Sequence, residues 1–361
     1  MLSLLLAAAC AVITTTCGAQ VPWRLETWAT GLDAPWSLTF LPDGGALVTE
    51  RPGSLRRIAA DGSVGEPLAG VPAVYDAGQG GLFDVVLHPQ FSDNALVYLS
   101  YAEGPPAANA TAIARGRLTD DGLAGVEVIY RVSPRKDTPV HYGGRMAFLP
   151  DGTLLLTTGD GFDYREAAQD IESGLGKVLR ITDSGEPAPG NPFAEAPDVW
   201  SYGHRNAQGL AVAPDGTVWL HEHGPRGGDE VNRLEAGSNY GWPAVTYGID
   251  YSGAVISPHT ALPGMVQPEY YWVPSIAPSG LAVYTGRMFP EWVGDLFVGA
   301  LVDREVRRLD IEDGRVVGEE ALFAERRVRM RDIRVGPDGA LYLVTDAVPG
   351  EVIRVTRENP D

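Results

Sequence analysis

The sequence predicts an all-β fold, a single six-bladed β-propeller made of four-stranded antiparallel blades. Short runs rich in β-branched and aromatic residues recur along the chain after residue 23, bounded by Gly, Pro, Asp and Asn. No long pattern of helical period interrupts them. A turn motif also repeats six times, at intervals that suit one blade each. These observations together predict a ring of similar sheets with no second domain.

The repeated motif places a reverse turn in front of a buried strand. Its four clearest copies contain Pro-Asp-Gly followed by an apolar run, with the prolines at positions 42, 150, 214 and 337. Two degenerate copies, at residues 88–91 and 289–292, fill the gaps. Successive prolines are therefore 47, 61, 64, 76 and 47 residues apart, and each interval is long enough for four strands and their loops.

The first and last copies of the motif lie near the two ends of the chain. We therefore expect a strand at residues 24–29 to complete the blade that contains residues 351–356, because closing the ring removes exposed sheet edges. A short helix is predicted near residues 166–172. In this interpretation residues 21–361 form one propeller, which is also the catalytic domain.

Residues 1–20 have the features of an export leader. The stretch is uncharged, its centre is apolar, and small residues lie near its end. The apolar part is too short for a membrane span. Because Ala7-Ala8-Ala9-Cys10 is similar to a lipoprotein cleavage box, we predict either a signal peptide or a lipoprotein-type leader. The protein is then periplasmic or extracellular, free or lipid-anchored, and cleavage after Ala19 leaves a domain without cysteine.

The charge balance limits the class of partner. The formal net charge is −19 at pH 7, because 28 Lys and Arg stand against 47 Asp and Glu. Such a chain repels nucleic acid, so binding of DNA or RNA is not expected. An acidic protein is compatible with a small neutral substrate, and a local cluster of arginines stands out against its overall negative charge. The sequence leaves open whether the protein is a monomer or a homodimer.

Glycine-rich stretches carry the polar residues expected near the propeller axis, where loops from distant parts of the chain meet. Gln79 lies among glycines in the first stretch, and His141 begins the second. Each of these also has a structural interpretation, as a tight loop or a structural histidine. The third and densest group of stretches comprises residues 202–206, 221–232 and 239–243.

The third group raises the question of a metal site. His221 and His223 flank a glutamate and suggest zinc, but no third ligand follows at a familiar spacing. Oxygen donors dominate the Gly-Pro and Asp-Glu pairs of residues 224–230. Oxygen ligands favour calcium over zinc.

A cluster of arginines occupies residues 326–334. Strand alternation predicts that Arg327, Arg329 and Arg331 share one face, with the apolar residues between them packed into the sheet. Because Arg binds carboxylates bidentately, we interpret this face as a site for an anion with several carboxylates. A solvated sheet edge is the alternative.

In order and spacing these stretches resemble the aldose sugar dehydrogenases that depend on pyrroloquinoline quinone (PQQ), the soluble glucose-dehydrogenase-like family of six-bladed propellers. The resemblance extends from Ala34 to Asp346. The motifs that carry it are Gly78-Gln79-Gly80-Gly81, His141 to Arg145, Gly176 to Arg180, Trp200 to Asn206, His223 to Asn232 and Ile276 to Gly280.

The resemblance implies roles for individual residues. His141 becomes the general base, Asp160 orients it, and Arg205 belongs to both the catalytic and the cofactor-binding groups. The family usually places a lysine on the cofactor where Val302 stands here, with Arg304 nearby. The residues implied to hold PQQ are Gln79, Arg205, Asn206, Arg329 and Arg331.

The resemblance also implies Ca²⁺. The backbone carbonyls of Gly224 and Pro225 match ligands of the ion that polarises the quinone, and Glu230 and Tyr240 match a second calcium site.

The activity implied is oxidation of the C1 hydroxyl of an aldose to the lactone, with hydride transfer to Ca²⁺-activated PQQ and onward transfer to an unidentified electron acceptor. A nicotinamide enzyme is not expected, because no G-x-G-x-x-G follows a strand. Two alternatives remain: a Ca²⁺-dependent lactonase on the same fold, and a non-catalytic recognition propeller.

Overall fold

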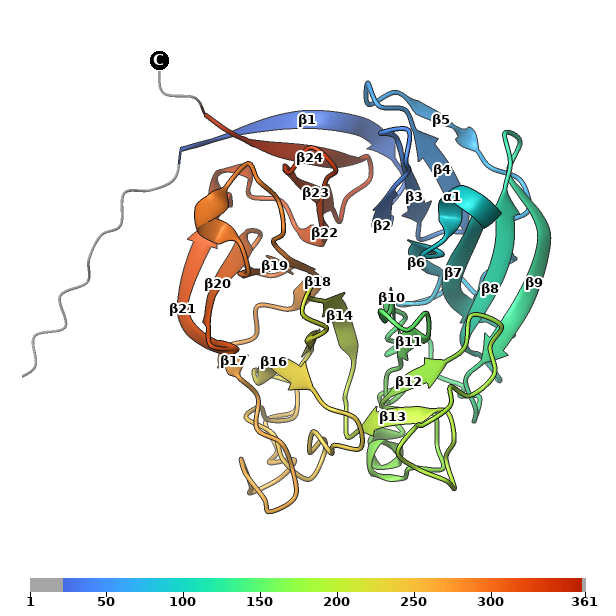
Figure 1. Ribbon diagram of the computed structural model, residues 1–361. Coiled ribbons are helices and arrows are strands. Elements are labelled where there is room, and N and C mark those ends of the chain that lie inside the picture. The colour runs from blue at the N-terminus through green and yellow to red at the C-terminus, as the bar shows by residue number, and fades with distance from the viewer. Residues whose placement is uncertain (1–21, 359–361) are drawn as a thin grey trace, which may run out of the picture.

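Six antiparallel sheets stand around a central axis in the computed structural model, which describes residues 22–358 (Figure 1). Each sheet has four strands, as the sequence predicts. The first three blades, from the innermost strand outward, are β2 (Pro35–Phe40), β3 (Ala46–Glu50), β4 (Ser54–Ile58) and β5 (Val64–Pro67); β6 (Leu82–Leu87), β7 (Leu96–Glu103), β8 (Ala110–Leu118) and β9 (Leu123–Arg131); and β10 (Met146–Phe148), β11 (Leu154–Thr157), β12 (Lys177–Ile181) and β13 (Val199–Tyr202).

The next three blades follow the same order. They are β14 (Ala207–Val212), β15 (Val218–Glu222), β16 (Asp229–Leu234) and β17 (Tyr270–Trp272); β18 (Pro278–Val283), β19 (Leu296–Ala300), β20 (Val306–Glu312) and β21 (Arg315–Leu322); and β22 (Met330–Val335), β23 (Leu341–Thr345), β24 (Gly350–Arg357) and β1 (Trp23–Leu32).

The two ends of the described chain close the ring. Strand β1 pairs antiparallel with β24, from Trp23 opposite Arg357 to Leu32 opposite Gly350. In Figure 1 the blue first strand accordingly lies beside the red last one. This confirms the predicted closure, although the N-terminal strand is longer than the expected 24–29.

All six copies of the turn motif join the innermost strand of a blade to its second strand. In the four Pro-Asp-Gly copies the glycine has φ between +82° and +88°, a left-handed conformation that glycine adopts without steric cost. The aspartate side chain accepts a hydrogen bond from the backbone N–H two residues on, as Asp43 does from Gly45 at 2.9 Å. The degenerate copies contain short helices instead, α1 (Phe91–Asn94) and η2 (Pro290–Trp292).

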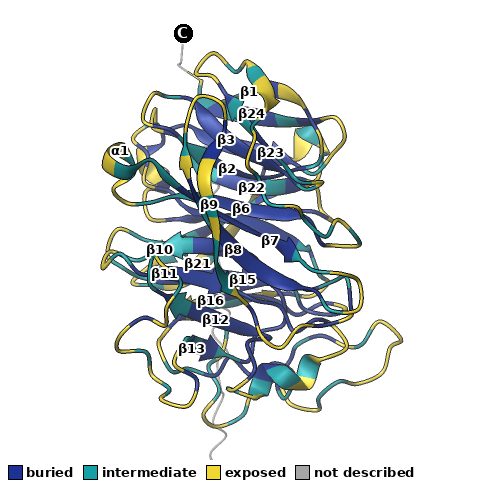
Figure 2. Cartoon of the chain, turned by 90° about the vertical axis from the view of Figure 1, so that its right-hand side faces the viewer, coloured by how far each residue is buried: buried dark blue, intermediate teal, exposed yellow. Residues whose placement is uncertain are grey.

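Apolar side chains fill the spaces between blades, so that strands are buried and the connecting loops exposed (Figure 2). The largest cluster lies between the last two blades and includes Phe289, Trp292 and Phe297. The helix predicted near residues 166–172 is a 3₁₀ helix, η1 (Arg165–Gln169), and a second one, η3 (Ala324–Arg326), precedes β22.

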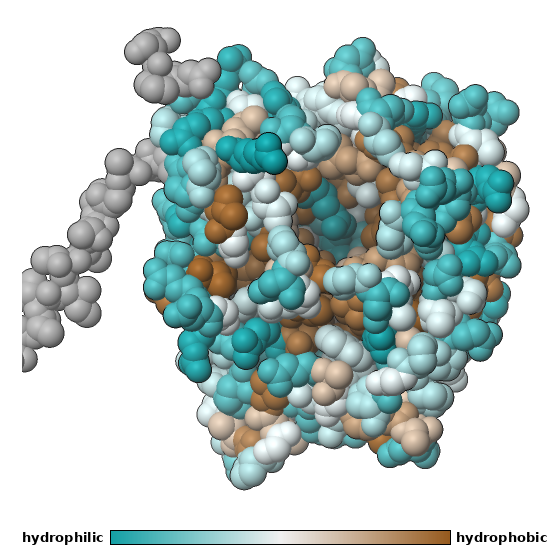
Figure 3. Space-filling model, viewed as in Figure 1, coloured by the Kyte–Doolittle hydropathy of each residue, from teal (hydrophilic) through white to brown (hydrophobic). Residues whose placement is uncertain are grey.

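Four charged side chains meet at the axis. Arg145 contacts Asp332 at 2.9 Å, and Arg334 contacts both Asp84 at 3.0 Å and Asp332 at 2.9 Å. The guanidinium of Arg145 also lies 4.0 Å from the centre of the Trp36 ring. Since these residues come from the first, second, third and last blades, they join the ring at its centre. Figure 3 shows the surface hollowed where the innermost strands converge.

The predicted leader at residues 1–20 lies outside the described residues. Within residues 22–358 no helix has the length and apolar character needed to cross a membrane.

We predict that Arg145→Met lowers the free energy of unfolding by about 3–5 kcal/mol, because the change leaves Asp332 and Asp84 as buried carboxylates with one cation fewer. Denaturant unfolding measures the difference. The matched control is Arg357→Met, which removes an exposed ion pair to Glu291; its unfolding curve should match that of the parent. Equal stability of Arg145→Met and the parent would contradict the prediction.

Candidate active site

Two cavities lie next to each other. His141 and Arg205 line the first, and the residues that follow them in the chain, Tyr142 and Asn206, line the second. The first has a volume of about 270 Å³ and is lined by residues that include His141, Asp160 and Arg205. The second has about 390 Å³ and is lined by residues that include Gln79, Asn206, Arg329 and Arg331. The structure thus brings together the predicted catalytic residues in one cavity and most of the predicted cofactor-binding residues in the other.

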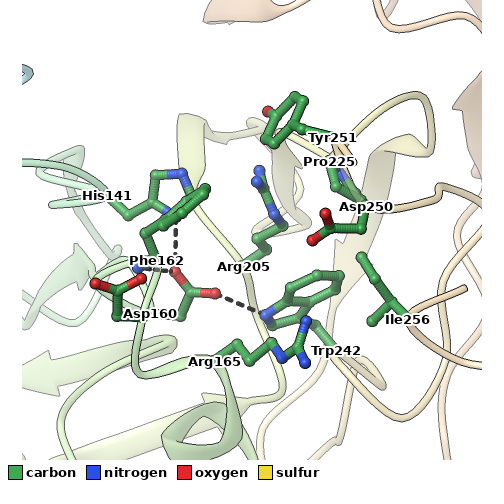
Figure 4. Close-up of a pocket in the computed structure, with 11 residues that line it drawn as sticks. His141, Asp160, Phe162, Arg165, Arg205, Pro225, Trp242, Asp250, Tyr251 and Ile256 are labelled. Atoms are coloured by element: carbon green, nitrogen blue, oxygen red, sulfur yellow. Dashed lines mark hydrogen bonds and ion pairs between the residues drawn. The ribbon is translucent and has the colours of Figure 1, made fainter. Parts of the chain in front are cut away.

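His141 and Asp160 form a buried pair. The imidazole Nδ1 lies 2.6 Å from Asp160 Oδ1, and Figure 4 shows the other ring nitrogen pointing away from the carboxylate. The backbone N–H of His141 donates to Gln79 Oε1 at 2.8 Å. His141 has φ +52°, which is uncommon for a residue other than glycine and orients the ring into the cavity. The pair can therefore accept a proton at the free nitrogen.

Burial and pairing act in opposite directions on this pair. Burial lowers the pKa of His141 below its ordinary value, although the hydrogen bond to Asp160 favours the charged ring. For Asp160 burial favours the neutral acid, but the hydrogen bond and charge of His141 and the charge of Arg205 hold its pKa below the ordinary value. At neutral pH the site therefore contains a carboxylate and a neutral imidazole, which is the form of histidine that acts as a base.

Both oxygens of Asp160 have donors. Oδ1 also accepts the backbone N–H of Phe162 at 2.8 Å, and Oδ2 accepts the indole N–H of Trp242 at 2.8 Å (Figure 4). Trp242 lies in a stretch singled out from the sequence, but no sequence signal assigns its indole to Asp160. The sequence interpretation also missed Phe162 and Tyr251, whose stacked rings line the first cavity with centroids 6.3 Å apart.

Arg205 connects the cavities to the predicted metal ligands. Its Nη1 donates to the carbonyl oxygens of His223 at 3.1 Å and Gly224 at 2.7 Å. Its backbone N–H donates to Glu222 Oε2 at 2.5 Å. The carbonyl of Gly224 therefore already points toward a positive charge, while Pro225 lines the first cavity.

The arginine cluster differs from the sequence prediction. Strand β22 begins only at Met330, and Arg327 has φ +51° at the end of η3, so Arg327 does not share a face with the other two. Arg329 and Arg331 do lie together, and both bind one carboxylate, Asp346, at 2.7 and 2.8 Å. Because one negative charge offsets two positive ones, the wall of the cavity keeps a net positive charge from this trio.

Asp346 was not recognised as a site residue from the sequence. Burial favours its neutral form, but the charges and hydrogen bonds of Arg331 and Arg329 hold its pKa below the ordinary value. Val302 and Arg304 are both exposed and line neither of the two cavities.

Glu230 and Tyr240 line a third, small space of about 10 Å³, together with Gly224 and Glu222. Burial, and the neighbouring carboxylate of Glu222, raise the pKa of Glu230 well above its ordinary value. Its carboxylate has only a long contact, 3.5 Å, from Asn232 Nδ2, and Asn232 Oδ1 has no partner. These oxygens form an incompletely satisfied polar site of the kind that a cation fits.

The hydroxyl of Tyr240 is already hydrogen-bonded to the protein backbone. Its hydroxyl donates to the carbonyl of Arg233 at 2.9 Å and accepts from the N–H of Glu235 at 2.8 Å, so only its backbone carbonyl is left as a metal ligand. Among residues 22–358 no three His, Cys, Asp or Glu side chains lie close enough together to hold a metal ion. A cation here would rely on backbone and amide oxygens as well.

The zinc interpretation of the two histidines is not supported. His221 Nε2 pairs with the carbonyl of Gly280 at 2.9 Å, and His223 Nε2 with that of Pro278 at 2.7 Å. Burial lowers the pKa of both to about 3. Both rings therefore serve as neutral hydrogen-bonding groups between blades.

The sequence matches the model of the glucose / sorbosone dehydrogenase family over residues 32–354. The chain belongs to this family. Aldose sugar dehydrogenase YliI of Escherichia coli is 42% identical over 347 residues, 93% of each protein. The crystal structure of the soluble E. coli aldose sugar dehydrogenase in its apo-form has a TM-score of 0.90 and 41% identity, and the match covers 93% of this chain and 100% of the other.

A structure with bound cofactor is also similar. The PQQ-bound form of aldose sugar dehydrogenase from Streptomyces coelicolor has a TM-score of 0.79 and 29% identity, with 94% of this chain and 100% of the other covered. Family membership and this likeness support an oxidoreductase of the sugar dehydrogenase type on the six-bladed fold.

We predict that the imidazole of His141 titrates below the ordinary histidine pKa of about 6.5 in the protein without ligands. Because the pKa is depressed on folding, the unfolded chain binds more protons, and His141 lowers the stability of the fold as pH falls below that ordinary value. NMR titration of a histidine-labelled sample measures the pKa directly. A titration above 6.5 would show that Asp160 outweighs burial.

Proposed function

We propose that the protein is a PQQ-dependent dehydrogenase that oxidises the C1 hydroxyl of an aldose to the lactone, with His141 as general base and Ca²⁺ bound beside the cofactor. The observation that carries the proposal is the His141–Asp160 pair, which lines the first cavity, next to a second cavity lined by Arg329 and Arg331. Quinone binding by a solved relative at 29% identity supports the choice of cofactor.

The second cavity fits a planar tricarboxylate. Arg329 and Arg331 supply two guanidinium groups to its lining, and Gln79 and Asn206 supply amides. A volume of about 390 Å³ is within the usual range for a cofactor site. When bound there, PQQ accepts two electrons and one hydrogen from the sugar as hydride.

The residues present also fit Ca²⁺ as a hard cation with oxygen ligands. The Gly224 carbonyl accepts one hydrogen bond from Arg205 and keeps its second lone pair for a cation, and Pro225 lines the first cavity. Glu230, Asn232 and the Tyr240 backbone offer a second, more buried set of oxygens. A metal at the first position supplies Lewis-acid polarisation of the quinone.

The protein's own side chains would have distinct roles in the proposed reaction. His141 takes the proton of the C1 hydroxyl at its free ring nitrogen, while the C1 hydrogen leaves with the electron pair of its bond. Asp160 holds the ring and stabilises the imidazolium that forms. Arg205 and the stacked rings of Phe162 and Tyr251 enclose the sugar and reduce its contact with water.

Membership of the glucose / sorbosone dehydrogenase family favours oxidation over the two alternatives, a Ca²⁺-dependent lactonase and a recognition propeller. Neither alternative requires two arginines and Gln79 in one cavity with a buried base in the next. The proposal includes a leader at residues 1–20, function in the periplasm or outside the cell, and transfer of electrons to an acceptor that nothing in the chain identifies.

Chelation should abolish aldose oxidation, and added Ca²⁺ should restore it, because the oxygen ligands described above hold hard cations. Reduction of a redox dye by protein reconstituted with PQQ, tested on a panel of aldoses, is the measurement. Full activity in protein treated with chelator and freed of metal would remove calcium from the proposal.

Arg331→Ala should weaken PQQ binding about ten- to a hundredfold, since each charge-assisted hydrogen bond contributes roughly 1.5–3 kcal/mol. Arg329→Ala should act in the same direction. The control is Arg326→Ala, whose side chain pairs with Glu351 away from the cavity. Titrations of PQQ that are alike for all three variants and the parent would show that the arginines do not hold the cofactor.

His141→Gln should reduce turnover by about 10² to 10⁴ while PQQ and Ca²⁺ bind as in the parent, because a positioned base contributes about that much to the rate. His88→Gln is the control, as His88 lies outside both cavities. If His141→Gln oxidises aldoses at the parental rate, the imidazole is structural and Asp160 becomes the first candidate for the base.

A further inference from the structure

The indole of Trp242 donates a hydrogen bond to Asp160, at the carboxylate oxygen that His141 does not contact. Its N–H is the only side-chain or backbone donor to Asp160 Oδ2 in residues 22–358, because the other two donors, His141 and Phe162, bond to Oδ1. We propose that Trp242 is a positioning residue of the dehydrogenase reaction, which fixes the plane of the Asp160 carboxylate and moderates its basicity toward His141. The inference rests on the proposed function.

The loop around Trp242 is held firmly enough for such a role. Gln169 in η1 donates from Nε2 to the Trp242 carbonyl at 2.7 Å and to Asn239 Oδ1 at 3.0 Å. The Trp242 backbone N–H donates to the carbonyl of Gly203 at 2.9 Å. With its backbone fixed on both sides and its ring buried, the indole has little freedom to leave the carboxylate.

The same ring also contacts a second charged group of the cavity, Arg205. The guanidinium of Arg205 lies 5.3 Å from the centre of the Trp242 ring, within the range of a cation–π interaction. Figure 4 shows the indole close to Arg205 and joined to the Asp160 carboxylate by a dashed line. One side chain thereby contacts both a negative and a positive group that line the cavity.

A neutral donor suits this position. The indole N–H donates one hydrogen bond and carries no charge, so it stabilises the carboxylate without competing with the imidazolium that forms on His141. Without that bond Oδ2 has no protein donor, and the carboxylate becomes both freer to rotate and a stronger acceptor for the imidazole proton. His141 then becomes more basic, and it holds a proton at pH values where the parental ring is neutral.

The direct test is Trp242→Phe in the protein reconstituted with PQQ and Ca²⁺. It keeps an aromatic ring under Arg205 and removes only the donor and one ring of the indole. We expect kcat to fall about tenfold and the acid limb of its pH profile to move up by about one unit, with PQQ affinity within about twofold of the parent. An acid limb at the parental pH, in a folded variant, overturns the proposal.

Trp272→Phe is the matched control. Trp272 is as buried as Trp242, and its indole donates to a carboxylate, Glu319, at 2.7 Å, but it lies on strand β17 outside both cavities. A merely structural role for Trp242 predicts that both variants lose stability and neither moves the pH profile. The proposal predicts a shift in Trp242→Phe alone.

A second measurement is independent of catalysis. Benzothienylalanine placed at position 242 keeps the shape of the indole and replaces its N–H by sulfur, and NMR then follows the titration of His141 in the protein without PQQ. An increase in the His141 pKa supports the role of Trp242 even if no aldose is oxidised, whereas an unchanged pKa refutes it. If the proposed function alone is wrong, the parent will not oxidise aldoses, but the increase in the His141 pKa will still be observed in the protein with benzothienylalanine at position 242.

Discussion

The ring depends on the guanidinium of Arg145, which is almost fully buried at the point where the innermost strands meet. It bonds to Asp332 at 2.9 Å, to the carbonyl of Gln208 at 2.9 Å and to the carbonyl of Arg331 at 3.1 Å, and it stacks on Trp36. Together with the blade of Arg145 itself, these contacts join four of the six blades. A buried charge persists only when it is paired and its donors are satisfied, so each blade must present its acceptor at one fixed position.

This constraint links the fold to the site. Arg145 holds the backbone of Arg331, whose side chain faces the second cavity, and it ends the run that begins with His141. The backbone of this run is close-packed: a Cβ on Gly144 would lie 2.8 Å from the Phe83 ring. The arginines that line the second cavity and the histidine that lines the first are thus positioned by the same central contacts.

The main features of the fold could be predicted because they depend on local chemistry. The six copies of the turn motif, two of them degenerate, give the number of blades, and the positions of the first and last copies near the chain ends give the pairing of β1 with β24. The alternation rule was wrong for Arg327, because η3 and a bulge between Met330 and Asp332 interrupt the strand pattern where the rule assumed a regular strand.

The site could be predicted as a set of residues but not as a set of contacts. The resemblance selected His141, Asp160 and the two arginines, and the structure brings them to adjoining cavities. It gave no sign of Trp242 on Asp160, since residues 82 positions apart meet only when the third and fourth blades pack together. The role of Asp346 was missed for a different reason, because an isolated aspartate after a strand has no distinctive spacing.

In the proposed reaction the hydrogen on C1 of an aldose leaves as hydride while His141 takes the hydroxyl proton. Stopped-flow reduction of bound PQQ by an aldose deuterated at C1, compared with the unlabelled sugar in a single turnover, tests this step. We expect markedly slower reduction with deuterium, because the C1–H bond breaks in that step, and a lactone as product. Equal rates of reduction for the two sugars, or a quinone that remains oxidised with both, would contradict it.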